Sequence, residues 1–186
     1  MVIVLRIGHR IDRDKRISSH LALVARALGA KKMIITGEQD LNLENSINKV
    51  SESWGGNFHL EIVPYDEWKT IIEKWKYTGR KIIHLTMYGE NLSVFEKSKA
   101  FNELRKQSNN VAVVLGGEKI PGKVFRYSDW NIAITNQPHS EVGSLAIFLD
   151  HFFDNALETS FKNSKKQIIP SLEGKKIFKK VDTNAS

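Results

Sequence analysis

Cysteine is absent from this sequence of 186 residues. Without thiols the protein can have no disulfide bond, no thiolate metal site and no cysteine nucleophile. Long apolar runs are missing as well, since no stretch approaches the roughly 18 residues that a membrane-spanning helix needs. The first ten residues, MVIVLRIGHR, place their apolar part before their charges, which is the reverse of the order in a signal peptide. We therefore expect a cytoplasmic protein without a membrane partner.

Familiar metal and nucleotide motifs are also missing. The six His residues and the carboxylates show no spacing typical of metal ligands, so we expect no metal site. Neither GxGxxG nor GxxxxGK[ST] occurs, which removes the usual dinucleotide and P-loop signatures. Apolar residues make up 41% and charged residues 26% of the chain, as in an ordinary globular domain. The length fits one domain with a small appendage.

The net charge of +7 is unevenly distributed along the chain. Residues 1–32 carry eight Lys and Arg against two acids, and residues 160–186 carry seven Lys against two acids. The segment between them holds 13 bases and 17 acids. A polyanionic partner such as nucleic acid would explain basic ends around an acidic middle. A solubilising surface with a Lys-rich tail would explain it equally well.

Short runs rich in Val and Ile alternate with stretches whose apolar residues recur at helical spacing. The runs predict strands over residues 2–6, 32–36, 59–63, 81–86, 111–115 and 131–135. The stretches between them predict helices that begin at Ser18 or Ser19, Asp40, Asp66, Ser93 and Ser140. The first four helices are expected to end at about residues 29, 54, 79 and 107. This alternation is typical of an α/β fold with a largely parallel sheet.

The composition changes after residue 161. Two short extended pieces, 167–170 and 175–179, flank a turn that contains Gly174, which predicts a small β-hairpin. A disordered tail is the alternative. We therefore divide the chain into a main domain, residues 1–161, and a basic extension, residues 162–186.

Three predicted strands end in loops with unusual residues. Parallel α/β sheets bind ligands where loops leave the carboxyl ends of the strands. Residues 85–89 are broken by Gly89, residues 113–121 contain the pair Gly116 and Gly117, and residues 134–140 lead into the last helix. Paired glycines let the backbone approach a ligand closely. Each loop taken alone is equally explained as a turn between a strand and a helix.

Residues 6–16 hold four Arg, one Lys, one His and two Asp in what we predict to be a loop. Arg suits bidentate phosphate recognition better than Lys does. The pattern therefore favours phosphate contacts with nucleic acid over a merely solvated loop. The candidate contacts are Arg6, Arg10, Arg13 and Lys15.

Three segments of the sequence resemble the archaeal tRNA (cytidine(56)-2′-O)-methyltransferases. They are VLRIGHRIDRDKRISSHLALVARALGA at 4–30, LGGEKIP at 115–121 and NQPHSEV at 136–142, in the same order as in that family. The resemblance covers essentially the whole chain. It implies the SPOUT fold, a Rossmann-like sheet with a C-terminal trefoil knot, and it favours the hairpin in the extension. It also implies a homodimer that methylates a tRNA ribose, at cytidine 56 of the T-loop, with S-adenosylmethionine as methyl donor.

The resemblance also implies which residues bind the cofactor. They are Leu85, Thr86 and Tyr88 in the first loop, Gly116, Gly117, Glu118 and Lys119 in the second, and Ile134, Asn136, Gln137, His139 and Ser140 in the third. Two other activities are open: methylation of a tRNA base by the same fold, and a non-catalytic role in RNA binding or assembly.

Methyl transfer to a ribose hydroxyl depends on orientation and on a group that accepts the hydroxyl proton. Ribose-methylating relatives use an Arg on the helix of the first motif, where this sequence has Leu23. They have Asn and Ser where this chain has His139 and Glu141. We predict that Arg16 positions phosphate and hydroxyl, with His139 as the next catalytic candidate. The identity of the proton acceptor is left open.

Overall fold

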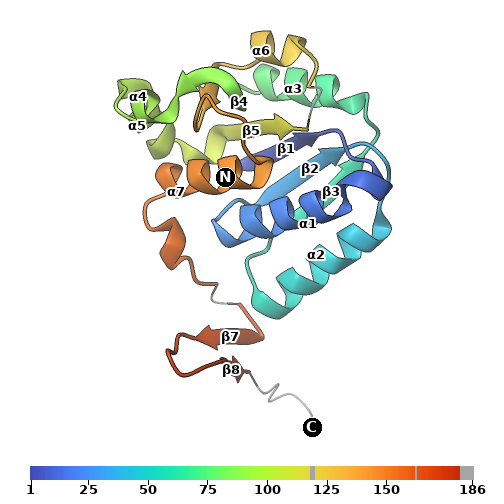
Figure 1. Ribbon diagram of the computed structural model, residues 1–186, viewed down its shortest axis with the longest axis vertical. Coiled ribbons are helices and arrows are strands. Elements are labelled where there is room, and N and C mark those ends of the chain that lie inside the picture. Colours follow the sequence, from blue (N-terminus) through green and yellow to red (C-terminus); the bar gives the residue numbers. More distant parts are fainter. Residues whose placement is uncertain (118–119, 162, 181–186) are drawn as a thin grey trace.

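The computed structural model describes residues 1–117, 120–161 and 163–180. A parallel sheet of six strands has the order β3-β2-β1-β5-β4-β6, and helices cover both of its faces (Figure 1). The strands are β1 Ile3–Ile7, β2 Lys32–Thr36, β3 His59–Val63, β4 Lys81–Asn91, β5 Val111–Gly116 and β6 Trp130–Ala133. The larger helices are α1 Ile11–Ala27, α2 Leu41–Trp54, α3 Glu67–Tyr77, α5 Lys99–Lys106 and α7 Glu141–Phe152. The predicted α/β fold with a largely parallel sheet is confirmed.

Both faces of the sheet are buried, which explains why its strands are nearly all apolar. Alternate residues along β5 belong to different core clusters: Val113 packs on the side of α1, α2 and α7, and Val114 on the side of α3 and α6 (Lys123–Tyr127). The core therefore has two layers with the sheet between them. The loops that follow the carboxyl ends of the strands are outside this core, and a ligand can bind there.

The predicted loop over residues 6–16 is wrong in its second half. Helix α1 begins at Ile11, seven residues before the predicted cap at Ser18. Asp12 and Asp14 lie in the first turn, where carboxylates favour a helix N-terminus, and Asp14 accepts a hydrogen bond from the backbone N–H of Arg10 at 3.1 Å. Ser18 lies inside the helix and points into the protein, where it contacts His9.

The other predicted helices are present with two changes. Asp40 and Ser140 cap α2 and α7 with their side chains, as predicted, whereas Asp66 precedes α3 without a capping hydrogen bond. The single helix predicted over 93–107 is two helices, α4 (Leu92–Phe95) and α5, because Ser98 accepts a hydrogen bond from the Phe101 N–H and starts a new helix there. Helix α6 was not predicted.

Strand β4 runs five residues beyond its predicted end. Its last part lies against β6, where Glu90 pairs with Ile132 after an irregularity in the register. Gly89 permits this approach, since a Cβ there would lie 2.3 Å from the carbonyl oxygen of Asn131. The prediction placed a loop at this point because a glycine inside a strand resembles a strand end.

The predicted C-terminal hairpin is confirmed by β7 (Lys166–Ile169) and β8 (Lys176–Lys179), which pair antiparallel and lie apart from the large sheet (Figure 1). Arg26 of α1 fixes the chain just before the hairpin. Its buried guanidinium donates two hydrogen bonds to the carbonyl oxygen of Gly55, at 2.6 and 3.1 Å, and lies 4.8 Å from the ring centroid of Phe161. Within the described ranges, no helix is long and apolar enough to cross a membrane.

Candidate functional site

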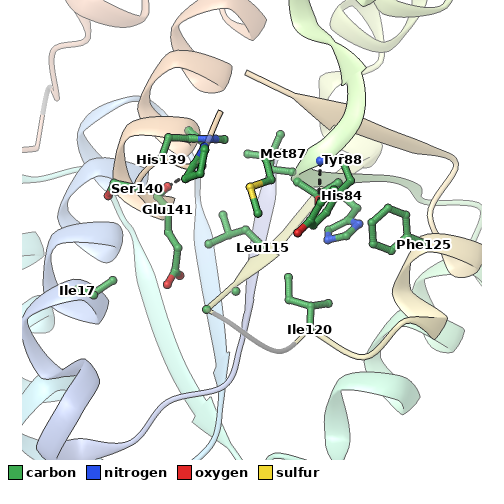
Figure 2. A pocket seen from close by; sticks show the side chains of 16 residues that line it. Ile17, His84, Met87, Tyr88, Leu115, Ile120, Phe125, His139, Ser140 and Glu141 are labelled. Carbon is green, nitrogen blue, oxygen red and sulfur yellow. Dashed lines mark hydrogen bonds between the residues drawn. The ribbon is translucent and has the colours of Figure 1, made fainter. Parts of the chain in front are cut away.

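A cleft of about 570 Å³ opens at the carboxyl ends of β4, β5 and β6. Figure 2 shows the three loops converging on it, and we call it the β4–β6 cleft. Its lining residues are Ile17, His84, Leu85, Thr86, Met87, Tyr88, Leu115, Gly116, Gly117, Ile120, Phe125, Pro138, His139, Ser140, Glu141 and Ser144.

The structure brings together seven of the twelve residues predicted to bind the cofactor. Leu85, Thr86, Tyr88, Gly116, Gly117, His139 and Ser140 all line the cleft. Ile134 packs against the core instead, and Gln137 is exposed. Glu118 and Lys119 lie outside the described residues.

Asn136 holds two walls of the cleft together. Its amide Nδ2 donates to the carbonyl oxygens of Met87 and Gly89, at 2.7 and 3.2 Å. Its Oδ1 accepts a hydrogen bond from Asn91 at 2.6 Å. Asn136 therefore shapes the cleft by binding the loop after β6 to the end of β4.

The cleft has an apolar end and a polar end (Figure 2). Ile120 and Phe125 line the apolar end, while Ser140 and Glu141 lie at the start of α7. A flat aromatic base suits the apolar end, and a polar group suits a helix N-terminus, where backbone N–H groups are unpaired. This division fits S-adenosylmethionine, which joins an adenine ring to a charged amino-acid end.

Arg6 requires a correction. Its side chain is fully buried, and it contacts Glu141 through two hydrogen bonds, from Nε at 2.9 Å and from Nη2 at 3.2 Å. It also donates to the carbonyl oxygen of Gly8. A buried guanidinium that is already paired cannot reach a polyanion, so we replace the predicted RNA contact with a structural role that joins β1 to α7.

A second cavity, of about 700 Å³, lies at the carboxyl ends of β1, β2 and β3. We call it the β1–β3 cavity, and it shares Gly117 with the β4–β6 cleft. Arg10 and Arg13, two of the predicted phosphate contacts, line it together with Asp14, Glu38 and Tyr65. Lys15 is exposed on α1 nearby in the sequence. Bases and acids therefore meet in this cavity.

Asp14 is tied to the arginines around it. Arg13 Nε lies 3.0 Å from its Oδ1. Burial by itself raises the pKa of Asp14, yet the hydrogen bonds from Arg13 and from the Arg10 backbone bring it below its ordinary value. Asp14 is therefore ionised at neutral pH and offsets part of the positive charge of the cavity.

His9 fixes the turn between β1 and α1. Its Nδ1 lies 2.9 Å from Ser18 Oγ, and its Nε2 lies 3.8 Å from Asp40 Oδ2. Burial, and then the charge of Arg6, lower the pKa of His9, so the ring is neutral. This neutral ring lines the cavity together with the next residue, Arg10.

The two catalytic candidates lie in different places. His139 lines the β4–β6 cleft, and its Nδ1 lies 2.7 Å from the carbonyl oxygen of Gln137. Because a carbonyl only accepts, the Nδ1 of His139 donates in this contact. Arg16 is exposed on α1, next to Ile17, and is not among the described residues that line the cleft.

Two titratable residues that line the cleft were missed from the sequence. Glu141 was noted only as a departure from a motif, and its pairing with Arg6 depends on a contact across 135 positions. His84 was placed in a strand and given no role, although it lines the cleft. The signal for His84 was a titratable residue inside an otherwise apolar strand.

Similarity to solved structures concerns the fold. A solved RNA 2′-O ribose methyltransferase matches 85% of this chain at 16% identity with a TM-score of 0.58. The SpoU methyltransferase AviRb of Streptomyces viridochromogenes, solved with AdoMet, matches 81% at 16% identity with a TM-score of 0.52. The chain spans about half the length of these two proteins, 55% of each. The chain therefore shares the fold of these two proteins over most of its length.

Sequence similarity identifies the family. The family described as "tRNA ribose 2′-O-methyltransferase, aTrm56" matches residues 54–178. The tRNA (cytidine(56)-2′-O)-methyltransferase of Methanocaldococcus jannaschii is 47% identical over 96% of this chain and 97% of its own length. The enzyme of the same name from Thermococcus kodakarensis is 44% identical with the same coverage of both chains. The chain belongs to this family of tRNA ribose 2′-O-methyltransferases.

Proposed function

We propose that the protein transfers a methyl group from S-adenosylmethionine to the ribose 2′-hydroxyl of cytidine 56 in the tRNA T-loop. The observation that carries this proposal is the β4–β6 cleft, built by the predicted loops in a chain of this family. Family membership supports the substrate, since the relatives are named for cytidine 56.

The cofactor would lie in the β4–β6 cleft. When bound, it supplies a methyl group activated by the positive sulfur. Leu85, Thr86 and Tyr88 would form one wall. Gly116 and Gly117 would form the second, and His139 and Ser140 would form the third. The third wall is already fixed by the hydrogen bonds of Asn136 to Met87 and Gly89.

His139 would accept the proton of the ribose hydroxyl. Its Nδ1 faces the carbonyl oxygen of Gln137, so Nε2 is the ring nitrogen available to the hydroxyl, and the residue lies at the polar end of the cleft. We expect His139→Ala to lower the transfer rate about 10²–10⁴-fold, while cofactor affinity measured by calorimetry changes less than about threefold. His139→Asn is the matched variant, because it keeps a polar side chain without a basic nitrogen. A transfer rate within threefold of wild type in both variants would remove His139 from this role.

The tRNA would approach over the β1–β3 cavity and the exposed face of α1. Arg10 and Arg13 line that cavity, which meets the cleft at Gly117, and Lys15 and Arg16 are exposed on α1. Basic side chains next to a cofactor cleft would hold the phosphates on either side of the target ribose.

We also propose a homodimer and a trefoil knot, which the family resemblance implies, and a cytoplasmic location, which the cysteine-free composition led us to expect. Apolar side chains support the dimer: Ile17 and Leu23 on α1 are 40% and 37% exposed, and Ile147 on α7 is 44% exposed. Helices α1 and α7 pack side by side, so one partner surface can cover both. Sedimentation of the purified protein at micromolar concentration tests this, and a single species of 21.2 kDa would contradict the dimer.

The chemical identity of the product tests the function. The protein is incubated with a tRNA transcript and S-adenosylmethionine, and the nuclease digest is analysed by mass spectrometry. We expect one methyl on the ribose of a cytidine, together with loss of alkaline cleavage after that nucleotide. A methyl on the base would establish the base methyltransferase instead. Binding of tRNA and cofactor without transfer would establish the non-catalytic alternative.

A further inference from the structure

His84 lies inside the protein on β4 and lines the β4–β6 cleft, yet one of its ring nitrogens is unpaired. The side chain is 1% exposed. Its Nδ1 lies 2.9 Å from Oδ1 of Asn131 on β6. Its Nε2 is buried and has no hydrogen-bond partner among the described residues. A buried polar atom without a partner is unfavourable, which indicates a ligand that completes it.

The hydrogen bonds of Asn131 determine which nitrogen of His84 carries the proton. The Nδ2 of Asn131 donates to the carbonyl oxygen of Phe125 at 3.1 Å, which orients Oδ1 toward His84. An amide oxygen only accepts, so Nδ1 of His84 is the protonated nitrogen. Burial lowers the pKa of His84, and the ring is neutral. Nε2 therefore has a lone pair and can only accept a hydrogen bond.

The surroundings of His84 are apolar. The ring of Phe125 packs edge-on against the imidazole, with centroids 4.9 Å apart and an angle of 88° between the planes. Figure 2 shows His84 beside Phe125 and near Ile120, away from Ser140 and Glu141. A single acceptor thus lies at the apolar end of the cleft, where a flat aromatic base fits.

We propose that His84 recognises the exocyclic amino group of the cofactor's adenine by accepting its hydrogen bond at Nε2. This inference rests on the proposed function. The amino group is the donor of an adenine ring, and the cofactor's hydroxyl and ammonium groups suit the polar end of the cleft. Hypoxanthine and guanine have a carbonyl oxygen at that position, which would place two acceptors face to face. Asn131 is a positioning residue, because it holds the ring in the accepting tautomer.

Binding of two matched ligands tests the proposal without any catalytic step. Calorimetry at pH 7.5 compares S-adenosylhomocysteine with its hypoxanthine analogue, S-inosylhomocysteine. We expect wild type to bind the adenine compound at least about tenfold more tightly, since a site built for a donor rejects an acceptor. In His84→Phe, this preference falls below about threefold, because the accepting nitrogen is gone. A preference that stays tenfold in this variant would overturn the proposal.

Two further variants separate recognition from packing. Asn131→Leu removes the acceptor for Nδ1, so the His84 proton can move to Nε2 and the preference for the adenine compound falls or reverses. Phe125→Leu keeps the accepting nitrogen and alters only the apolar wall. We expect it to weaken both compounds by the same factor and to keep the tenfold preference. The opposite pattern, with the preference retained in Asn131→Leu and lost in Phe125→Leu, would contradict the assignment.

A measurement on the wild-type protein needs no variant to fold. Nitrogen NMR of protein with ¹⁵N-labelled histidine reports which nitrogen of His84 is protonated. We expect the proton on Nδ1, and the Nε2 signal should move as S-adenosylhomocysteine saturates the site. A proton on Nε2, or an Nε2 signal that does not move at saturation, would overturn the proposal.

The outcomes distinguish this inference from the proposed function. If both compounds bind wild type equally, cofactor binding stands and adenine recognition by His84 is wrong. If neither binds at high micromolar concentration, the proposed function fails and the inference fails with it.

Discussion

Two cavities lie at the carboxyl edge of the sheet, and they use their polar groups differently. In the β1–β3 cavity Asp14 bonds to Arg13, and His9 bonds to Ser18 through Nδ1 while its Nε2, without a hydrogen-bond partner among the described residues, lies 3.8 Å from the carboxylate of Asp40. In the β4–β6 cleft the Nε2 atom of His84 is unpaired. The unpaired nitrogen of His9 thus has a carboxylate nearby, among charges that largely balance within the chain, whereas that of His84 lies beside the aromatic ring of Phe125.

The two regions are therefore suited to different kinds of ligand. A charged, internally paired surface keeps its shape and attracts a polyanion through its remaining exposed bases. An apolar pocket with few uncommitted polar atoms selects a ligand by shape and hydrogen bonding. Arg6 connects the two regions, because it lies on β1 and its side chain bonds to Glu141, which lines the cleft.

The largest loss of stability is expected on substitution of Arg6, the residue that joins the two regions. Arg6→Met leaves Glu141 without its buried partner, and loss of one member of a buried pair costs about 3–5 kcal/mol. We expect the free energy of unfolding in urea to fall by that amount. Arg16→Gln, at an exposed position on α1, is the control and should change it by less than about 0.5 kcal/mol. Equal stability of the two variants would show that the regions are independent.

A smaller effect is expected at the wall of the cleft. Gly89→Ala places a Cβ 2.3 Å from the carbonyl oxygen of Asn131, so β4 must move away from β6. We expect a loss of about 1–3 kcal/mol in unfolding free energy, together with weaker cofactor binding. Gly143→Ala in α7 meets no atom within 4 Å and should stabilise the protein by up to about 1 kcal/mol. A Gly89→Ala variant as stable as wild type would contradict the close approach of the two strands.

A pH dependence is expected from one histidine in each region. His9 and His84 have pKa values lowered mainly by burial, whereas the unfolded chain takes up a proton at each near pH 6.5. Stability is therefore full above pH 6.5 and decreases as the pH falls below it, by up to about 1.4 kcal/mol per pH unit for each histidine. Urea unfolding between pH 7.5 and 5 measures this. His9→Phe and His84→Phe should each remove about half of the slope, and a flat wild-type profile would contradict neutral buried rings.

The smallest effect is expected on tRNA affinity. Arg10→Gln or Lys15→Gln should weaken binding only a few-fold and lower the slope of log affinity against log salt by about 1. Filter binding at several salt concentrations measures both quantities. Lys81→Gln, exposed at the amino end of β4 and thus at the opposite edge of the sheet, is the matched control and should change neither. The same salt slope in all three variants would place the tRNA elsewhere.

Much of the fold could be predicted because local patterns and tertiary structure agree. The apolar runs predicted all six strands of the parallel sheet, and Asp40 and Ser140 marked helix starts that the structure confirms. The start of α1 was missed because Ser18 is a typical cap residue, whereas the actual start depends on Asp14 reaching back to Arg10. The preference of Ser for helix caps cannot show that Ser18 is instead buried against His9.

The site was predictable only in part, for the same physical reason. The three loops could be found because strand ends and glycines are visible in the sequence. Side-chain pairings between residues far apart in the sequence cannot be predicted in this way. Arg6 was predicted to contact RNA, whereas its side chain is paired with Glu141, 135 positions away. Likewise, the tautomer of His84 depends on its hydrogen bond to Asn131, 47 residues away on a neighbouring strand.

Methylation of the ribose of cytidine 56 requires a single atom of the substrate, the 2′-oxygen of that nucleotide. Two tRNA transcripts are compared, identical except that one carries 2′-deoxycytidine at position 56, and transfer of labelled methyl from S-adenosylmethionine is measured. We expect about one methyl per tRNA for the normal transcript and none for the deoxy transcript. Equal labelling of both transcripts would contradict ribose methylation at cytidine 56.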